Sequence, residues 1–261
     1  MPPLIIYGFI YYWLIKLCYN FIVICMINFV LNNWNNDDVD KLDNYLYSIR
    51  VKDKIEWGKN IVNTNMDYLA IKLPILKNIA KDIYKGNFIS YLELMPHKYF
   101  ESCTIDAFVI SLINDFNLQT KYIKKLSKFI DNWSVVDSLK FKIKGNEDKY
   151  MSFANELLKS KKPFSRRIGV RIYFSFVKLE KYHQDIFSTL DKLLEEEHYY
   201  VNMAAAWLLC EMFIHFPEKT FSYLNNHNTN KFIINKGISK CRDSFRVSQE
   251  NKEKLLKYKM K

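Results

Sequence analysis

The chain has 261 residues, of which 49% are hydrophobic and 26% charged, so it is long enough to bury a core and too apolar to be intrinsically disordered. Lys and Arg outnumber Asp and Glu by 39 to 28, and this excess favours a polyanionic partner, either nucleic acid or an anionic membrane surface, although an AT-rich genome accounts for part of it. The five cysteines show no CxxC or Cys/His spacing, which argues against a zinc site or a disulfide scaffold and is typical of a reducing cytosol.

Residues 4–31, LIIYGFIYYWLIKLCYNFIVICMINFVL, form an almost wholly apolar segment whose length would span a bilayer. No basic stretch precedes it and no small-residue cleavage site follows it, which argues against a secretory signal. Three interpretations stay open: a membrane anchor, a buried or interfacial helix, or spurious upstream sequence before a start near Met26. We expect residues 1–31 to be separate from a folded domain over 38–261.

Beyond this segment, apolar residues recur at helical spacing in one stretch after another. Pro74, Pro163 and Pro217 each stand where a helix can begin, and Gly86 follows a helix at a C′ position. The predicted helices cover residues 39–49, 73–84, 98–115, 118–131, 147–159, 164–178, 184–196, 199–215, 217–225, 229–241 and 248–259.

This pattern predicts an all-α fold, because no alternating strand pattern appears and the helices are joined by short connections. Paired antiparallel helices stacked side by side would form an α-solenoid of the HEAT type, whose repeats run about 40–47 residues. A compact helical bundle is the alternative.

Common catalytic signatures are absent from the sequence, which has no P-loop, GxGxxG, HExxH or GxSxG motif. The five histidines show no metal-binding spacing. We therefore expect neither a metal nor a cofactor, and three other features remain as candidates for function.

The first feature is DNWSVVDSL (131–139), in which Trp133 and Asp137 are four residues apart and share one face of a helix. The alternative is a core tryptophan with a salt-bridging aspartate, and either Asn132 or Asp131 could cap the helix.

The second feature is KKPFSRRIGVRIYFSF (161–176), which gathers Arg166, Arg167 and Arg171 at the start of a helix. The helix dipole disfavours cations there, so the cluster indicates an anionic partner, with a solvated basic face as the alternative.

The third feature lies in the C-terminal third. Trp207 stands in YYVNMAAAWLLCEMF (199–213), where it is either a functional aromatic residue or a core residue. Farther along, basic residues recur at near-helical intervals and resemble a phosphate-binding edge: Lys236, Lys240, Arg242 and Arg246.

Taken in order, DNWSVVDSL, PFSRRIGV, YYVNMAAAWLLCEMFIHFPEKTFSYL and NKGISKCRDSFRVS resemble the DNA alkylation repair family, the AlkD-like group of HEAT-repeat alkylpurine DNA glycosylases. The resemblance runs from about Asp38 to the C-terminus, and LAIKLPILKNIAKDIYKGNF (69–88) resembles the family's first repeat. It implies a right-handed superhelix whose concave face holds duplex DNA containing alkylated purines. It also implies a cytoplasmic, nucleoid-associated monomer, with membrane contact only if residues 4–31 are an anchor.

The resemblance also implies roles for individual residues. Asp137 matches the catalytic aspartate, Trp133 and Trp207 match two aromatic residues of the cleft, and Arg167 matches its arginine, with Arg166 as the alternative. The residues expected to contact DNA are Arg166, Arg171, Lys236, Lys240, Arg242 and Arg246. Family members excise N3- or N7-alkylated purines and leave the base stacked.

The sequence departs from the family pattern at Ser134, where a small or acidic residue is frequent, and at Asn202, where this subgroup often has a basic residue. Two alternative functions therefore stay open. One is a DNA-binding solenoid without catalytic activity, and the other is a protein-interaction scaffold.

Overall fold

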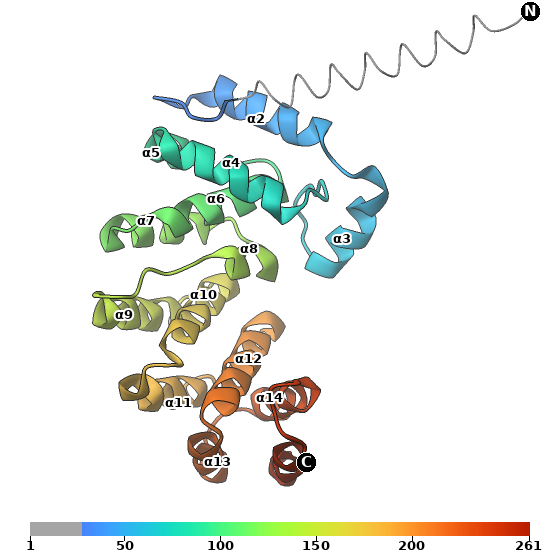
Figure 1. Cartoon of the computed structure of the whole chain (residues 1–261), viewed down its shortest axis with the longest axis vertical. Helices are drawn as coiled ribbons and strands as arrows, with labels where there is room; N and C mark the ends of the chain where they lie inside the picture. The colour runs from blue at the N-terminus through green and yellow to red at the C-terminus, as the bar shows by residue number, and fades with distance from the viewer. Residues whose placement is uncertain (1–27) are drawn as a thin grey trace, which may run out of the picture.

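The computed structural model describes residues 28–261, so most of the apolar segment 4–31 lies outside the described residues, and its three interpretations stay predictions. The described part of the chain contains 14 α-helices, four short 3-10 helices and no β-strand, which confirms the all-α class (Figure 1). Within it, no helix has both the length and the hydrophobicity needed to cross a membrane.

Every helix predicted from periodicity is present, with shifted boundaries, and two short helices, α3 and α5, were not predicted. Their apolar repeats are too short to give a clear period. The helices are α2 (Asn36–Ser48), α3 (Ile55–Val62), α4 (Leu73–Lys85), α5 (Phe88–Glu93), α6 (Phe100–Leu112), α7 (Phe116–Leu126), α8 (Trp133–Ser138), α9 (Glu147–Leu158), α10 (Pro163–Tyr173), α11 (His183–Asp191), α12 (Tyr199–His215), α13 (Pro217–Asn225), α14 (Lys231–Asp243) and α15 (Gln249–Leu255).

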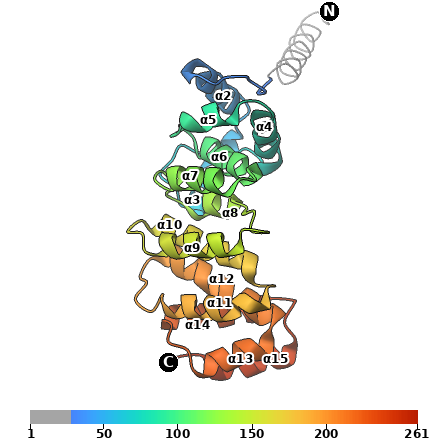
Figure 2. The same ribbon diagram turned by 90° about the vertical axis from the view of Figure 1, so that its left-hand side faces the viewer.

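The helices form two layers of a curved stack, as Figures 1 and 2 show. In the inner layer, α4, α6, α8, α10, α12 and α14 each pack against the next. In the outer layer, α5, α7, α9 and α13 cover α4, α6, α10 and α12, respectively. The inner helices begin at Leu73, Phe100, Trp133, Pro163, Tyr199 and Lys231. The fold is thus a helical-repeat solenoid, with a closer spacing than the ~40–47 residues of HEAT repeats.

Two inner helices are buried around most of their circumference. Nearly every residue of α6 is buried, and most of α12 is buried as well, because each is packed between neighbouring inner helices and an outer helix. The three prolines predicted to begin helices stand in the first turn of α4, α10 and α13.

The prediction for Gly86 was half wrong. It follows α4, but its backbone is extended (φ −91°) rather than left-handed. A Cβ at this position would lie 2.4 Å from the carbonyl oxygen of Leu31, so the close approach of another chain segment requires the glycine. Phe29 and Trp34, on either side of Leu31, are buried, so residues immediately before α2 belong to the packed structure.

A buried carboxyl group holds the loop that leads into α4. Glu101 of α6 is fully buried and accepts hydrogen bonds from the backbone N–H groups of Leu69 (3.0 Å) and Ile71 (3.3 Å). Burial raises the pKa of Glu101 to about 7, although these backbone hydrogen bonds oppose the shift.

We predict that this carboxyl group makes stability depend on pH. The folded-state pKa of Glu101 exceeds its usual value of 4.5. The stabilising contribution of the protonated carboxyl group is therefore fully present below pH 4.5 and is lost as pH rises to about 7. The side chain of Glu101→Gln cannot ionise. Between pH 4.5 and pH 8, the free energy of unfolding of the wild type should therefore fall by about 3 kcal/mol relative to that of the variant. Urea unfolding of both proteins measures this, and identical pH profiles would contradict it.

Candidate functional site

The short helix α8 is anchored at its N-terminus by two side chains. The buried side chain of Asn132 accepts a hydrogen bond from the N–H of Val135 (3.0 Å) and caps the helix. Asp131 does not cap it. Its carboxylate accepts hydrogen bonds from the hydroxyl of Thr64 (2.6 Å) and the N–H of Asn65 (2.7 Å). The start of α8 is therefore tied to the turn that follows α3.

This tie places α3 beside the first predicted aromatic residue. The indole N–H of Trp133 lies 3.4 Å from the carbonyl oxygen of Ile61 in α3, and the Ile61 side chain is half exposed. One wall of the site thus comes from a helix that sequence periodicity missed.

Asp137, four residues after Trp133, is paired with two arginines of α10. A terminal NH₂ group of Arg167 (Nη2) lies 3.0 and 2.8 Å from its two carboxylate oxygens, and Arg171 Nε lies 3.2 Å from one of them. The other terminal nitrogen of Arg167 donates to the carbonyl oxygen of Tyr200. The side chains of Arg167 and Arg171 are only 5% and 11% exposed, whereas that of Asp137 is 19% exposed. Asp137 is therefore the most accessible member of this cluster.

Arg171 connects this cluster to the second predicted aromatic residue. Its guanidinium carbon lies 4.3 Å from the ring centre of Phe174 and 5.0 Å from that of Trp207. The indole N–H of Trp207 donates to Glu211 (3.2 Å). Burial lowers the pKa of Arg171, while the carboxylate of Asp137 raises it. The carboxylate and the aromatic rings thus offset the cost of removing this cation from water.

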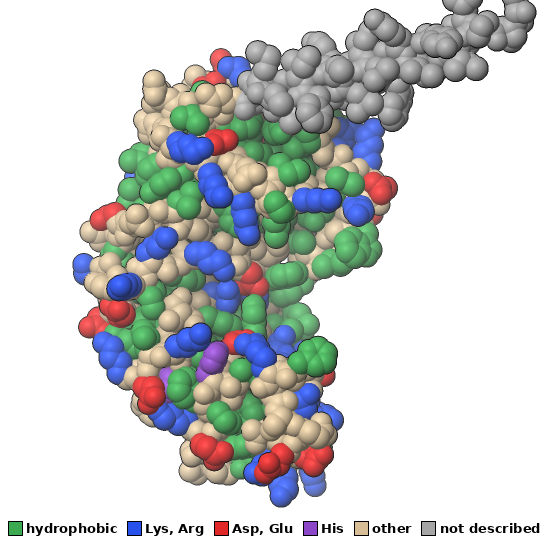
Figure 3. Space-filling model, viewed as in Figure 1, with side chains coloured by type: hydrophobic (Ala, Val, Ile, Leu, Met, Phe, Trp, Pro, Cys, Tyr) green, Lys and Arg blue, Asp and Glu red, His purple; other side chains and the backbone are tan. Residues whose placement is uncertain are grey.

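A cleft of about 390 Å³ opens over these residues. Figure 3 shows the corresponding hollow at the right-hand edge of the molecule, with basic and acidic side chains inside it. The structure brings five of the predicted site residues together here and adds four that were not predicted. The lining residues are Ile61, Trp133, Asp137, Arg167, Tyr199, Tyr200, Met203, Trp207 and Lys240.

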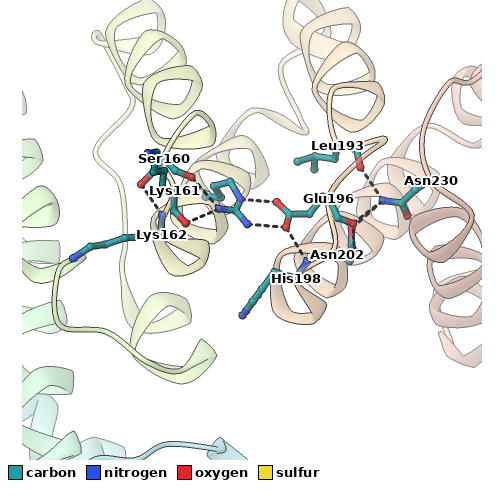
Figure 4. Close-up of polar contacts among 9 residues, drawn as sticks. Ser160, Lys161, Lys162, Leu193, Glu196, His198, Asn202 and Asn230 are labelled. Carbon is teal, nitrogen blue, oxygen red and sulfur yellow. Dashed lines mark hydrogen bonds and ion pairs between the residues drawn. The ribbon is translucent and has the colours of Figure 1, made fainter.

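Arg166, the alternative to Arg167, has a different partner. Its guanidinium donates two hydrogen bonds to the carboxylate of Glu196 (2.6 and 2.8 Å), in the network of Figure 4. It also donates to the carbonyl oxygens of Ser160 and Lys161. Arg167, and not Arg166, therefore lies beside Asp137.

Asn202, which stands where the family subgroup often has a basic residue, belongs to the same network. Its amide donates to the carbonyl oxygen of Glu196 (2.7 Å) and accepts from Asn230 (3.1 Å), so it joins the loop before α12 to α14 (Figure 4). The buried position explains why a neutral side chain fits here.

The basic residues of the tail differ in position and in partners. Lys240 lines the cleft, and Lys236, one turn earlier in α14, is exposed. Arg242 is exposed two residues beyond Lys240, about 200° farther round the helix. Arg246 forms an ion pair with Glu211.

Residues 28–261 contain no group of three or more His, Cys, Asp or Glu side chains that could hold a metal ion. Comparison with protein families gives a match over most of the fold: the family model described as DNA alkylation repair enzyme matches residues 42–240. The chain belongs to this family. No curated protein sequence matches it.

Membership in the DNA alkylation repair family gives the cleft a context. It supports a general role in DNA repair and makes DNA the expected substrate or partner. The matched range begins within α2 and ends within α14, so every residue that lines the cleft lies in the family region. The anionic partners of Arg166, Arg167 and Arg171 are Asp137 and Glu196 of the protein itself.

We predict that Asp137→Asn destabilises the fold, because it leaves two buried guanidinium groups without their carboxylate. The free energy of unfolding should fall by about 2–4 kcal/mol, somewhat less than for a fully buried pair. Glu196→Gln is the matched control, since it removes a comparable ion pair away from the cleft and should also be destabilising. Urea denaturation measures both, and a more stable Asp137→Asn variant would refute the prediction.

Proposed function

We propose that this protein is a monofunctional DNA glycosylase, which hydrolyses the N-glycosidic bond of cationic N3- or N7-alkylated purines in duplex DNA. The observation that supports this most is a partly exposed carboxylate, Asp137, in a cleft lined by two indoles, Trp133 and Trp207. Membership in the DNA alkylation repair family supports the choice of DNA as substrate.

The chemistry suits this small set of groups. An alkylated purine that already carries a positive charge is a good leaving group, so no strong general acid is needed. Breaking the bond leaves an oxocarbenium-like sugar, as in glycoside hydrolysis generally. A carboxylate about 4 Å from that charge stabilises it by ~4 kcal/mol at an effective dielectric constant near 20. This is equivalent to roughly a thousandfold in rate, before desolvation reduces it.

The two indoles add to this stabilisation. An aromatic face attracts a cation by about 0.5–2 kcal/mol, so Trp133 and Trp207 favour both the cationic lesion and the cationic sugar. In this proposal Asp137 stabilises the sugar and orients the attacking water, while the indoles line the approach of the lesion.

The ion pairs modify the role expected for Arg167. Its two terminal nitrogens already contact Asp137 and Tyr200, and its side chain is almost completely buried, so it positions the carboxylate. Lys240 lines the same cleft and forms no ion pair within the described residues, so it is the better candidate for a phosphate contact. DNA phosphates near the cleft also offset the two guanidinium charges, which leaves the carboxylate more effective toward the sugar.

A specific observation favours the second candidate, a DNA-binding protein without catalytic activity. Asp137 is already compensated by two arginines, as a purely structural ion pair would be. This alternative predicts that the wild-type protein binds duplex DNA with a steep inverse dependence on salt and releases no base.

We predict that Asp137→Asn lowers the release of N7-methylguanine from methylated duplex DNA by about a thousandfold. DNA affinity should stay similar or increase, because the variant removes a negative charge from the binding face. Glu196→Gln should release base at nearly the wild-type rate, so the comparison separates loss of chemistry from loss of stability. Both variants are assayed below their unfolding temperatures. Equal release by Asp137→Asn and the wild type would rule out the mechanism.

A further inference from the structure

A second cavity shares Asp137 with the cleft and is lined by neither indole. It has a volume of about 420 Å³ and lies between α4, α6 and the segment that follows α8. We refer to it as the lysine groove, because four lysines line it: Lys77 and Lys81 of α4, and Lys140 and Lys142 after α8. Asp137 lines both cavities, so the groove continues directly from the cleft.

The segment after α8 presents its lysines in a regular pattern. Lys140, Lys142 and Lys144 are exposed, whereas Phe141 and Ile143 between them are partly buried against the core. This alternation is that of an extended chain with one face on the protein and the other in solvent. On α4, Lys77 and Lys81 are one turn apart and share a face.

The backbone beneath these lysines is held in place by buried polar groups. The N–H of Lys140 donates to the hydroxyl of Ser111 (2.8 Å), and its carbonyl oxygen accepts from the amide of Gln119 (3.3 Å). Gln119 is fully buried and also accepts a hydrogen bond from Tyr150. The groove wall is therefore preorganised, which reduces the entropy lost when a ligand binds.

The four ammonium groups are uncompensated. Within the part of the chain that the structure describes, none of them forms an ion pair or a side-chain hydrogen bond; Lys77 lies 5.4 Å from the ring centre of Phe108. Arg166, Arg167, Arg171 and Arg246, by contrast, are all paired with carboxylates. Apart from Lys240, which lines the cleft, the unpaired positive charge next to the site thus belongs, within the described residues, to four lysines for which the sequence predicted no function.

We propose that the lysine groove binds the phosphodiester backbone of the DNA strand whose sugar lies at Asp137. A row of strongly hydrated point charges along a fixed wall suits successive phosphates, and the shared carboxylate places those phosphates next to the reacting nucleotide. This inference rests on the proposed function for the position of the sugar. It extends that function by assigning the residues that hold the backbone on the side of α4.

The first test uses the full chain and a fluorescein-labelled undamaged duplex. Binding is followed by fluorescence anisotropy over a range of KCl concentrations for Lys140→Gln/Lys142→Gln and for Lys77→Gln/Lys81→Gln. Each lost phosphate contact should reduce the slope of log K against log[salt] by about 0.9. The matched control, Lys124→Gln/Lys149→Gln, removes two lysines from the outer helices α7 and α9 and should keep the wild-type slope.

The second test locates the phosphates. Single uncharged methylphosphonates replace each phosphate near an abasic-site analogue, on one strand at a time. The wild type should lose affinity at a few adjacent positions of the analogue-containing strand, and Lys140→Gln/Lys142→Gln should be insensitive to the same replacements. Unchanged salt slopes, or equal sensitivity of variant and wild type, would overturn the proposal.

The readouts separate the two hypotheses. Reduced slopes without base release by the wild type would support the lysine groove and refute the glycosylase. Base release by the wild type with unchanged slopes would support the glycosylase and refute the lysine groove.

Discussion

The ion cluster of Asp137, Arg167 and Arg171 is the interaction on which the site depends. It joins α8 to α10, and through the contact of Arg171 with Trp207 it reaches α12. Two charges at about 4 Å attract by ~4 kcal/mol at an effective dielectric constant near 20, which is large compared with the entropy of one side chain. The cluster therefore fixes the carboxylate in a cleft lined by two indoles that come from different repeats.

Positive charge on this face is divided between two residue types with different tasks. Arginine forms planar, bidentate pairs and loses little freedom for each hydrogen bond, so it suits fixed contacts such as Arg166 with Glu196. Lysine is a flexible, strongly hydrated charge, and Lys77, Lys81, Lys140 and Lys142 remain available to a mobile polyanion. The net charge of +11 is thus less informative than the positions of the unpaired cations.

The solenoid brings these groups together through contacts between successive helices. Each inner helix packs on the next, and local ties set the geometry where repeats meet. The bond from Thr64 to Asp131 and the approach of Trp133 to Ile61 bring α3 against α8, although α3 lies far from α8 in the sequence. Curvature then leaves the cleft open at the hollow in Figure 3, and the lysine groove adjoins the cleft at Asp137.

The sequence by itself determined most of the helices, their proline starts, the shared face of Trp133 and Asp137, and the family, because these depend on local periodicity and on motifs within single segments. Only the tertiary structure decided which cations have partners. Arg167 lies 30 residues from Asp137, and Arg246 lies 35 residues from Glu211, so no helical period relates the members of either pair. The position of α3 beside the cleft was also decided by packing, since a helix of eight residues has too short a pattern to reveal it.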